Sequence, residues 1–264
     1  MGKYYKKTVK PSITANAATA FANTDLLFDW FAFDIPRGAA RIRSFTATVA
    51  GTNGTAQTVP NIDLIFAKDL NGVAPATLGT PNNKLSNGDT LTKAITTSVK
   101  NHIIGYAELI ANNIKTEAFF GPSYEIFTQA TAGTQAGGDI LDNIILEGEV
   151  NPTNKGSQRI YIAAITKGAL DFGTDMQLNQ VGNQAAATAA TQITIEQGSG
   201  GVGVAANSFA VGDVLRGATG GPTMEIVSLD SATTMTVKNI SEQIDNNEEL
   251  ILDAPIVFHF GFEY

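Results

Sequence analysis

The C-terminal segment 256–264 places the tightest constraint on the fold. Apolar side chains stand at every second position, at Ile256, Phe258, Phe260, Phe262 and Tyr264, and alternate with Val257, His259, Gly261 and Glu263. Because successive side chains of a strand point to opposite faces, this period predicts a strand with one wholly apolar face. Such a face has to be buried, so the sequence predicts a second sheet packed against this strand.

Other runs of strand length occur along the chain. They lie at 26–33, 40–49, 62–66, 124–128, 143–150 and 159–166. Segments rich in Gly, Pro and Asn separate them, which is typical of turns and loops. Short strands divided by turn signals are characteristic of sandwiches and barrels. We therefore expect an all-β fold whose main domain is a jelly-roll-like β-sandwich.

The segment 98–116 allows two interpretations. Val99, Ile103, Tyr106 and Ile110 fit the apolar stripe of a helix, whereas Gly105 and the paired isoleucines before it also allow a strand. We expect a helix here, and little helix elsewhere.

The N-terminal segment differs from the rest of the chain. Four of the 17 basic residues lie within its first ten positions, and no core-forming period follows them. We predict that residues 1–20 form a flexible basic arm.

A change in amino-acid composition near residue 179 marks a second structural unit. Residues 179–190 are rich in Gln, Asn and Ala and are typical of a linker, and short apolar runs at close spacing follow them. We predict that 191–253 is an inserted small β-barrel. The main domain then comprises 21–178 plus 254–264, because insertions are tolerated in surface loops whose ends lie close together.

Composition narrows the classes of partner. The chain has 264 residues, a formal net charge of -8, 16% charged residues and no cysteine. An acidic chain repels phosphate backbones, which argues against nucleic acid as the main partner. No apolar run reaches the roughly 20 residues of a membrane span. The basic N-terminus is not followed by the apolar core of a signal peptide, so we expect cytosolic synthesis without secretion and no membrane partner.

Signals for catalysis or cofactors are weak. The two histidines, His102 and His259, have no carboxylate at ligand spacing. Residues 198–203 match a dinucleotide-binding glycine pattern, but a further turn and strand follow where a helix is required. The acidic run 245–249 lacks the alternation of an EF-hand loop, and Glu147 with Glu149 is a carboxylate pair of a common kind. We expect no enzyme activity, catalytic residue, cofactor or metal.

Basic and aromatic residues are the candidate partner contacts. They are Lys3, Tyr4, Tyr5, Lys6, Lys7, Lys10, Arg37, Arg41 and Arg43. Tyrosine and arginine are enriched at interfaces. The three arginines have two interpretations that the sequence leaves open. They block extension of a sheet edge, or they contact an acidic neighbour.

One segment carries a family resemblance. Residues 209–221, with apolar runs at 224–229 and 235–239 and Glu248 to Ile251, resemble a small β-module that recurs in virion proteins of tailed bacteriophages. In those modules a glycine precedes the last glutamate, whereas in this chain Asn247 precedes Glu248. The outer domain, with the turn 34–40 between strands, looks like a phage head-decoration protein. The resemblance implies a virion component and assigns no contact residue.

These observations favour a structural protein of a virus particle. The expected function is a capsid decoration or cement protein that binds the major capsid protein and forms homo-oligomers. A tail, baseplate or fibre-adaptor protein is one alternative. A polysaccharide-binding or polysaccharide-acting protein is another, from a different class.

Overall fold

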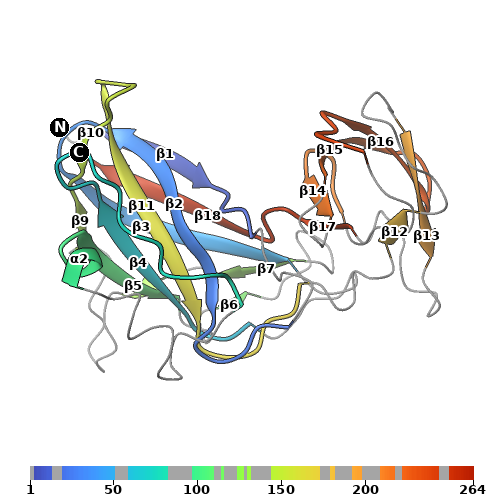
Figure 1. Ribbon diagram of the computed structural model, residues 1–264, viewed down its shortest axis with the longest axis horizontal. Helices are drawn as coiled ribbons and strands as arrows, with labels where there is room; N and C mark the ends of the chain where they lie inside the picture. The colour runs from blue at the N-terminus through green and yellow to red at the C-terminus, as the bar shows by residue number, and fades with distance from the viewer. Residues whose placement is uncertain are drawn as a thin grey trace.

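The protein is all-β, as predicted, and its described residues form three antiparallel sheets (Figure 1). The computed structural model describes residues 3–13, 20–50, 59–82, 97–109, 114–115, 124–127, 130–131, 144–172, 179–181, 192–197, 209–217, 222–243 and 250–264. Two of the sheets pack face to face as a β-sandwich.

The first sheet contains the two ends of the chain. Its order is β1 (Tyr4–Val9), β18 (Ile256–Glu263), β3 (Ala40–Ala50), β7 (Tyr124–Phe127) and β6 (Ile114–Lys115), and β9 (Ile145–Leu146) also pairs with β3. We call it the β1–β18 sheet. The apolar side chains of β18 are buried, and its Val257, His259, Gly261 and Glu263 face outward, as the alternation predicts.

The second sheet faces the first. It contains β2 (Leu26–Pro36), β11 (Ser157–Thr166), β4 (Ile62–Lys68), β5 (Ile103–Leu109) and β8 (Ala130–Thr131), and β10 (Glu149–Val150) also pairs with β11. We call it the β2–β11 sheet. The one helix of the described chain, α2 (Thr97–Lys100), is a single turn before β5.

Strand pairing in the sandwich follows a simple rule. The rule applies to eight strands, which follow one another along the chain in the order β1, β2, β3, β4, β5, β7, β11 and β18. The first pairs with the last, the second with the seventh, the third with the sixth and the fourth with the fifth. These eight strands of the sandwich therefore pair like the strands of one long hairpin.

Phe260 of β18 lies at the centre of that core. Its ring stacks on Phe45 of β3, with centroids 4.7 Å apart. It also contacts Phe33 of β2 and Phe66 of β4, at 5.8 and 5.9 Å. One side chain thus bridges both sheets, and aromatic pairs add to the free energy of burial.

The loop that contains Ala76 and Leu78 packs on the outer face of the β2–β11 sheet. Leu78 from this loop and Val99 from α2 form a buried cluster with Leu26 and Ala163 of the sheet. Trp30 donates from Nε1 to the carbonyl of Ala76 at 2.8 Å, which fastens the loop to β2.

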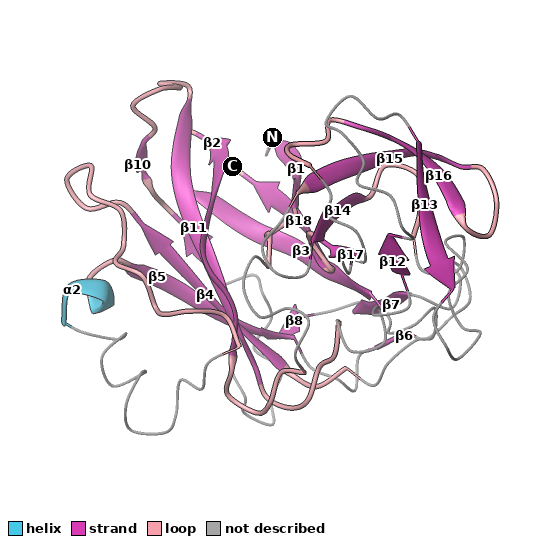
Figure 2. Cartoon of the chain, turned by 45° about the vertical axis from the view of Figure 1, so that its right-hand side comes forward, coloured by secondary structure: helices cyan, strands magenta, loops and turns pink. Residues whose placement is uncertain are grey.

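The third sheet is formed by residues 179–252. Its order is β12 (Asn179–Val181), β13 (Gln192–Gln197), β16 (Thr234–Lys238), β15 (Thr223–Leu229), β14 (Val214–Gly217) and β17 (Leu250–Leu252). The outer strands β12 and β17 contact each other, so the sheet curls (Figure 2). β12 lies in the segment that the sequence suggested as a linker, and it pairs with β13 instead.

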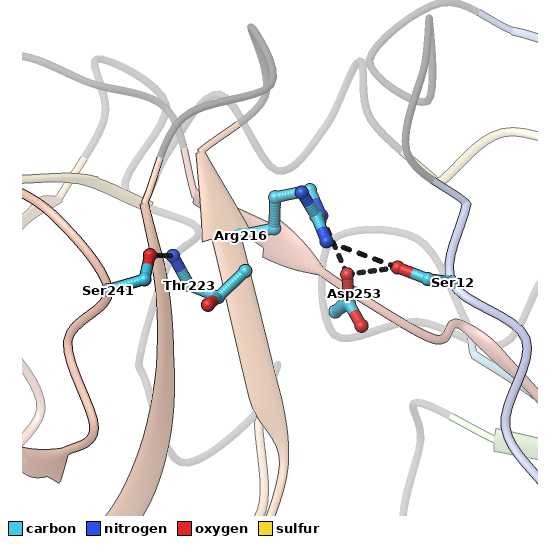
Figure 3. A network of polar contacts seen from close by, with 5 residues as sticks. All are labelled: Ser12, Arg216, Thr223, Ser241 and Asp253. Carbon is cyan, nitrogen blue, oxygen red and sulfur yellow. Dashed lines mark hydrogen bonds and ion pairs between the residues drawn. The ribbon is translucent and has the colours of Figure 1, made fainter.

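Asp253 joins the third sheet to the sandwich. Its Oδ1 accepts hydrogen bonds from Nε of Arg216, at 2.6 Å, and from the hydroxyl of Ser12 (Figure 3). Arg216 also donates from Nη2 to that hydroxyl, at 3.2 Å. The backbone amide of Ile13 donates to the Asp253 carbonyl at 2.9 Å. The segment after β1 is therefore tied to the strand that leaves the third sheet.

Two further predictions are wrong. Residues 4–9 of the expected flexible arm form β1, which pairs along its length with β18. Tyr5, Lys7 and Val9 alternate toward the sandwich interior, a period that the lysine obscures in the sequence. The expected helix at 98–116 is limited to α2, and β5 follows it. Pairing with β4 decides the conformation, because a buried edge needs backbone partners.

Candidate protein-binding face

The outer face of β1, β18 and β3 brings predicted contact residues together. Three rows cross these strands: Tyr4, Glu263 and Arg41; Lys6, Gly261 and Ser44; Thr8, His259 and Thr46. Their side chains are exposed or half-buried, and no described segment is packed over them as the loop is over the opposite outer face. We call these nine residues, with Arg43, the basic face.

A β-bulge in β3 positions Arg43. The register shifts between Gly261 and Phe262, where Ser44 and Ile42 are the partners, so Arg43 is the extra residue. Bulges re-aim side chains in this way. Nε of Arg43 lies 3.1 Å from Oε2 of Glu263. This ion pair neutralises the one acidic side chain of the basic face and leaves Lys6 and Arg41 as its net positive charge.

A hollow of about 330 Å³ lies over Gly261. Its lining includes Lys6, Thr8, Thr46 and His259. A Cβ built on Gly261 would lie 2.2 Å from Oγ of Ser44, so glycine makes room for that hydroxyl. The hollow offers hydroxyl and ammonium donors, a set that suits a carboxylate or a backbone carbonyl of a partner protein.

His259, which lines this hollow, has a lowered pKa. Nδ1 lies 3.2 Å from the Thr8 hydroxyl. Partial burial lowers the pKa of His259 below its ordinary value, and the charges of Lys10 and Lys6 lower it further. The imidazole is therefore held toward its neutral form, because its surroundings are already positive.

A second hollow lies at the end of the same sheet. It has a volume of about 420 Å³, and Arg41, Ile145, Glu263 and Tyr264 line it. Ile145 and Tyr264 are 51% and 42% exposed, and Tyr4, in the same row as Arg41, is 72% exposed. Exposed aromatic and aliphatic area beside arginine has the composition of a protein interface.

The other predicted contacts lie elsewhere. Lys3 joins the chain ends through backbone bonds to Tyr264. Tyr5 packs against the core, and Arg37 lies exposed after β2, where its amide donates to Gly156. Lys7 and Lys10 line a groove on the side of the sandwich. The structure therefore brings four predicted residues, Tyr4, Lys6, Arg41 and Arg43, to the basic face.

Sequence reasoning missed several members of the basic face. The alternation in the last strand places His259, Gly261 and Glu263 on the outward side, which was the available signal. Ser44 and Thr46 alternate with the apolar Phe45 and Ala47, but only strand register makes them neighbours of β18.

Three carboxylates, among them Glu149 of the pair considered for catalysis, have structural partners. Glu149 accepts hydrogen bonds from the amides of Asn71 and Gly72, at 2.5 and 2.7 Å, and so holds the turn after β4.

The buried Asp63 forms an ion pair with Lys167 at 2.5 Å, and Glu108, opposite it, accepts from Asn61 at 2.9 Å. Burial raises the pKa of Tyr106, and its hydrogen bond to Asp63 raises it further.

The described residues also bear on the expected absence of a metal site and of a membrane partner. Within them, no three His, Cys, Asp or Glu side chains gather as metal ligands, and no helix has the length and hydropathy to span a membrane. The buried His102 contacts the Lys68 carbonyl through Nδ1 at 2.8 Å. The glycine pattern at 198–203 and the acidic run 245–249 lie outside the described residues.

Comparison with known proteins found no match among protein-family models or curated proteins.

Proposed function

We propose that this chain is a non-enzymatic structural protein of a virus particle, a decoration or cement protein that binds the capsid surface. The observation that carries the proposal is the basic face, where lysine, arginine and exposed tyrosine gather on one sheet of a protein with net charge -8. Such a surface suits an acidic protein partner.

The arrangement of the two outer faces supports this choice. The loop and α2 cover the β2–β11 sheet, whereas the basic face presents polar donors. Lys6 and Arg41 are exposed, so an acidic partner can approach both charges. Two tyrosines and Ile145 supply the apolar area that such a contact needs.

We further propose that the sandwich is a jelly roll. Its strands pair first with last, second with seventh, third with sixth and fourth with fifth. A rolled-up hairpin has this pairing. Viral capsid domains and lectins use this architecture. The fold supports a virion role without assigning it, because function depends on sites rather than folds.

The proposed action is mechanical. Each copy binds weakly through a polar, charged face, and many copies on one shell hold neighbouring capsid subunits together. Several weak contacts made by one assembly give high overall affinity. Homo-oligomerisation would add to this effect. We propose that the protein is made in the host cytoplasm and becomes part of the virion there. Its partners are then capsid protein and other copies of itself, and not nucleic acid or a membrane.

A tail, baseplate or fibre-adaptor role is the second candidate. The third sheet favours it, because this sheet lies beside the sandwich (Figure 1) and contains the segment that resembles phage virion modules. In that role the third sheet contacts the host or another tail protein, and the basic face holds the protein on the tail.

The test is cryo-electron microscopy of purified particles of the virus that encodes the chain. Density for the sandwich across the whole shell supports the decoration role. A few copies at the tail support the second candidate. Particles without the protein, or turnover of capsular polysaccharide by the pure protein, would overturn both.

A further inference from the structure

The sandwich is open along one side. Among the strands that the structure describes, β1 and β2 are edge strands of their sheets, and each is paired on one side only, with β18 and β11 respectively. Both border the same groove, which has a volume of about 710 Å³. Unpaired strand edges carry free amides and carbonyls that can pair with another chain.

The two edges are protected to different degrees. β1 carries Lys6 and Lys7, and lysine is a common means of blocking edge pairing. The first half of β2 is covered, because the Asn82 amide donates to the Leu26 carbonyl at 2.8 Å and Trp30 holds the loop. From Phe31 to Phe33 no charge or proline interrupts β2, and no described backbone pairs with its free edge.

The groove beside that free edge is positive. Lys7, Lys10 and Arg159 line it, together with Phe31 and one acid, Asp34. Both Asp34 oxygens accept from Nδ2 of Asn151 at 2.8 Å, and Oδ2 accepts from the Ser157 hydroxyl at 3.2 Å. In the described part of the chain neither lysine forms an ion pair.

We propose that an extended, acidic peptide segment of a neighbouring protein adds as a strand to the edge Phe31–Asp34. Its backbone would pair with β2, as in β-strand addition. Alternate side chains of the added strand would point to the inner side of the sheet, beside Phe31, and carboxylates at these positions would face Lys7 and Lys10 across the groove. This site is separate from the basic face, and the inference does not depend on the virion role.

The test uses the intact protein and a synthetic probe. The probe is a short fluorescein-labelled peptide in which Glu and Val alternate, and fluorescence anisotropy measures its binding. A second peptide carries N-methyl groups on alternate amides, which keeps its charge but removes strand pairing along one edge. We expect the first peptide to bind and the second to bind at least about tenfold more weakly, since each lost hydrogen bond costs roughly 0.5–1.5 kcal/mol.

Protein variants test the charge contribution. Lys10→Glu, at an exposed position, and Lys7→Glu should each weaken the acidic peptide about tenfold, a loss of about 1.4 kcal/mol. Lys155→Glu, at an exposed position outside the groove lining, is the matched control and should have no effect. Because the N-methylated peptide is tested on unaltered protein, the result does not require that Lys7→Glu fold.

Three results would overturn the inference: no binding of the acidic peptide, equal binding of the N-methylated peptide, or equal loss in the control variant. A dimer that Lys10→Glu dissociates, seen by sedimentation without peptide binding, would assign the groove to a second copy instead. Failure here leaves the proposed virion role intact, because the basic face is tested on particles.

Discussion

Nε of Arg216 in β14 lies 2.6 Å from Oδ1 of Asp253, the residue that follows β17. Both side chains are largely buried, at 19% and 18% exposure. β18 begins three positions later, at Ile256, so this ion pair sets where the chain leaves the third sheet and enters the core of the sandwich.

Replacing Asp253 by Asn should therefore weaken the junction. The substitution keeps the shape but removes the charge that Arg216 and Ser12 contact. We expect a loss of about 1.5–3 kcal/mol in the free energy of unfolding, the range for hydrogen bonds to charged groups. Denaturant unfolding measures it. Glu225→Gln is the matched control. It breaks an exposed pair with Lys238, 2.9 Å apart, that is expected to contribute less than about 1 kcal/mol. Equal losses in the two variants would contradict the assignment.

Replacing residues 179–252 by a short Gly/Ser linker tests whether the third sheet is a separable insert. The long hairpin of the sandwich remains complete in this variant. Buried residues of the third sheet belong to the same apolar cluster as the sandwich core, so we expect a lower melting temperature but a single cooperative transition. Circular dichroism and calorimetry measure it. A soluble protein without a cooperative transition would show that the two parts fold as one unit.

Charge reversal on the basic face should impair partner binding without unfolding the protein. Lys6→Glu and Arg41→Glu alter exposed side chains, where stability changes are usually within about 0.5 kcal/mol. We expect particle binding to weaken more than about tenfold, and more at low than at high ionic strength because salt screens exposed charges. Quantitative pull-down with purified particles checks this. Unchanged occupancy at both salt concentrations would exclude the basic face as the docking surface.

The titration of His259 predicts a pH effect on stability. Because burial, Lys10 and Lys6 lower its pKa in the folded state, the unfolded chain binds a proton more readily. Its contribution to stability is complete above the unfolded pKa of about 6.5. It falls as the pH drops below that value and stops changing below the folded pKa. Melting temperatures of the wild type and His259→Gln between neutral and mildly acidic pH should diverge as the pH falls. Parallel curves would show that His259 does not contribute.

Gly148 tests the packing between β10 and β11. A Cβ at this position would lie 2.4 Å from the Arg159 carbonyl oxygen and 2.9 Å from Cδ1 of Ile160. Gly148→Ala should cost about 1–3 kcal/mol, the range for overpacking, because backbone has to move. Gly156→Ala in the same hairpin is the control, since its nearest atom lies at 3.5 Å. Urea unfolding measures both. A Gly148→Ala variant as stable as the control would contradict the close contact.

The sequence alone determined the strands whose side chains alternate strictly. Segment 256–264 predicts both the buried phenylalanines and the outward His259 and Glu263, because a strand has only two faces. The all-β class follows from the same local pattern repeated between turn residues. The sequence also identified the basic and aromatic residues from which the candidate contacts came.

Tertiary structure decided the rest. Residues 4–9 carry lysines that hide their period, and only pairing with β18 makes them a strand. Segment 103–109 fits helix and strand locally, and the edge of β4 selects strand. The basic face joins residues near positions 6, 43 and 260, and such distant neighbours arise from strand register. Register depends on which buried faces pack together, a property of the whole core that no short window of sequence contains.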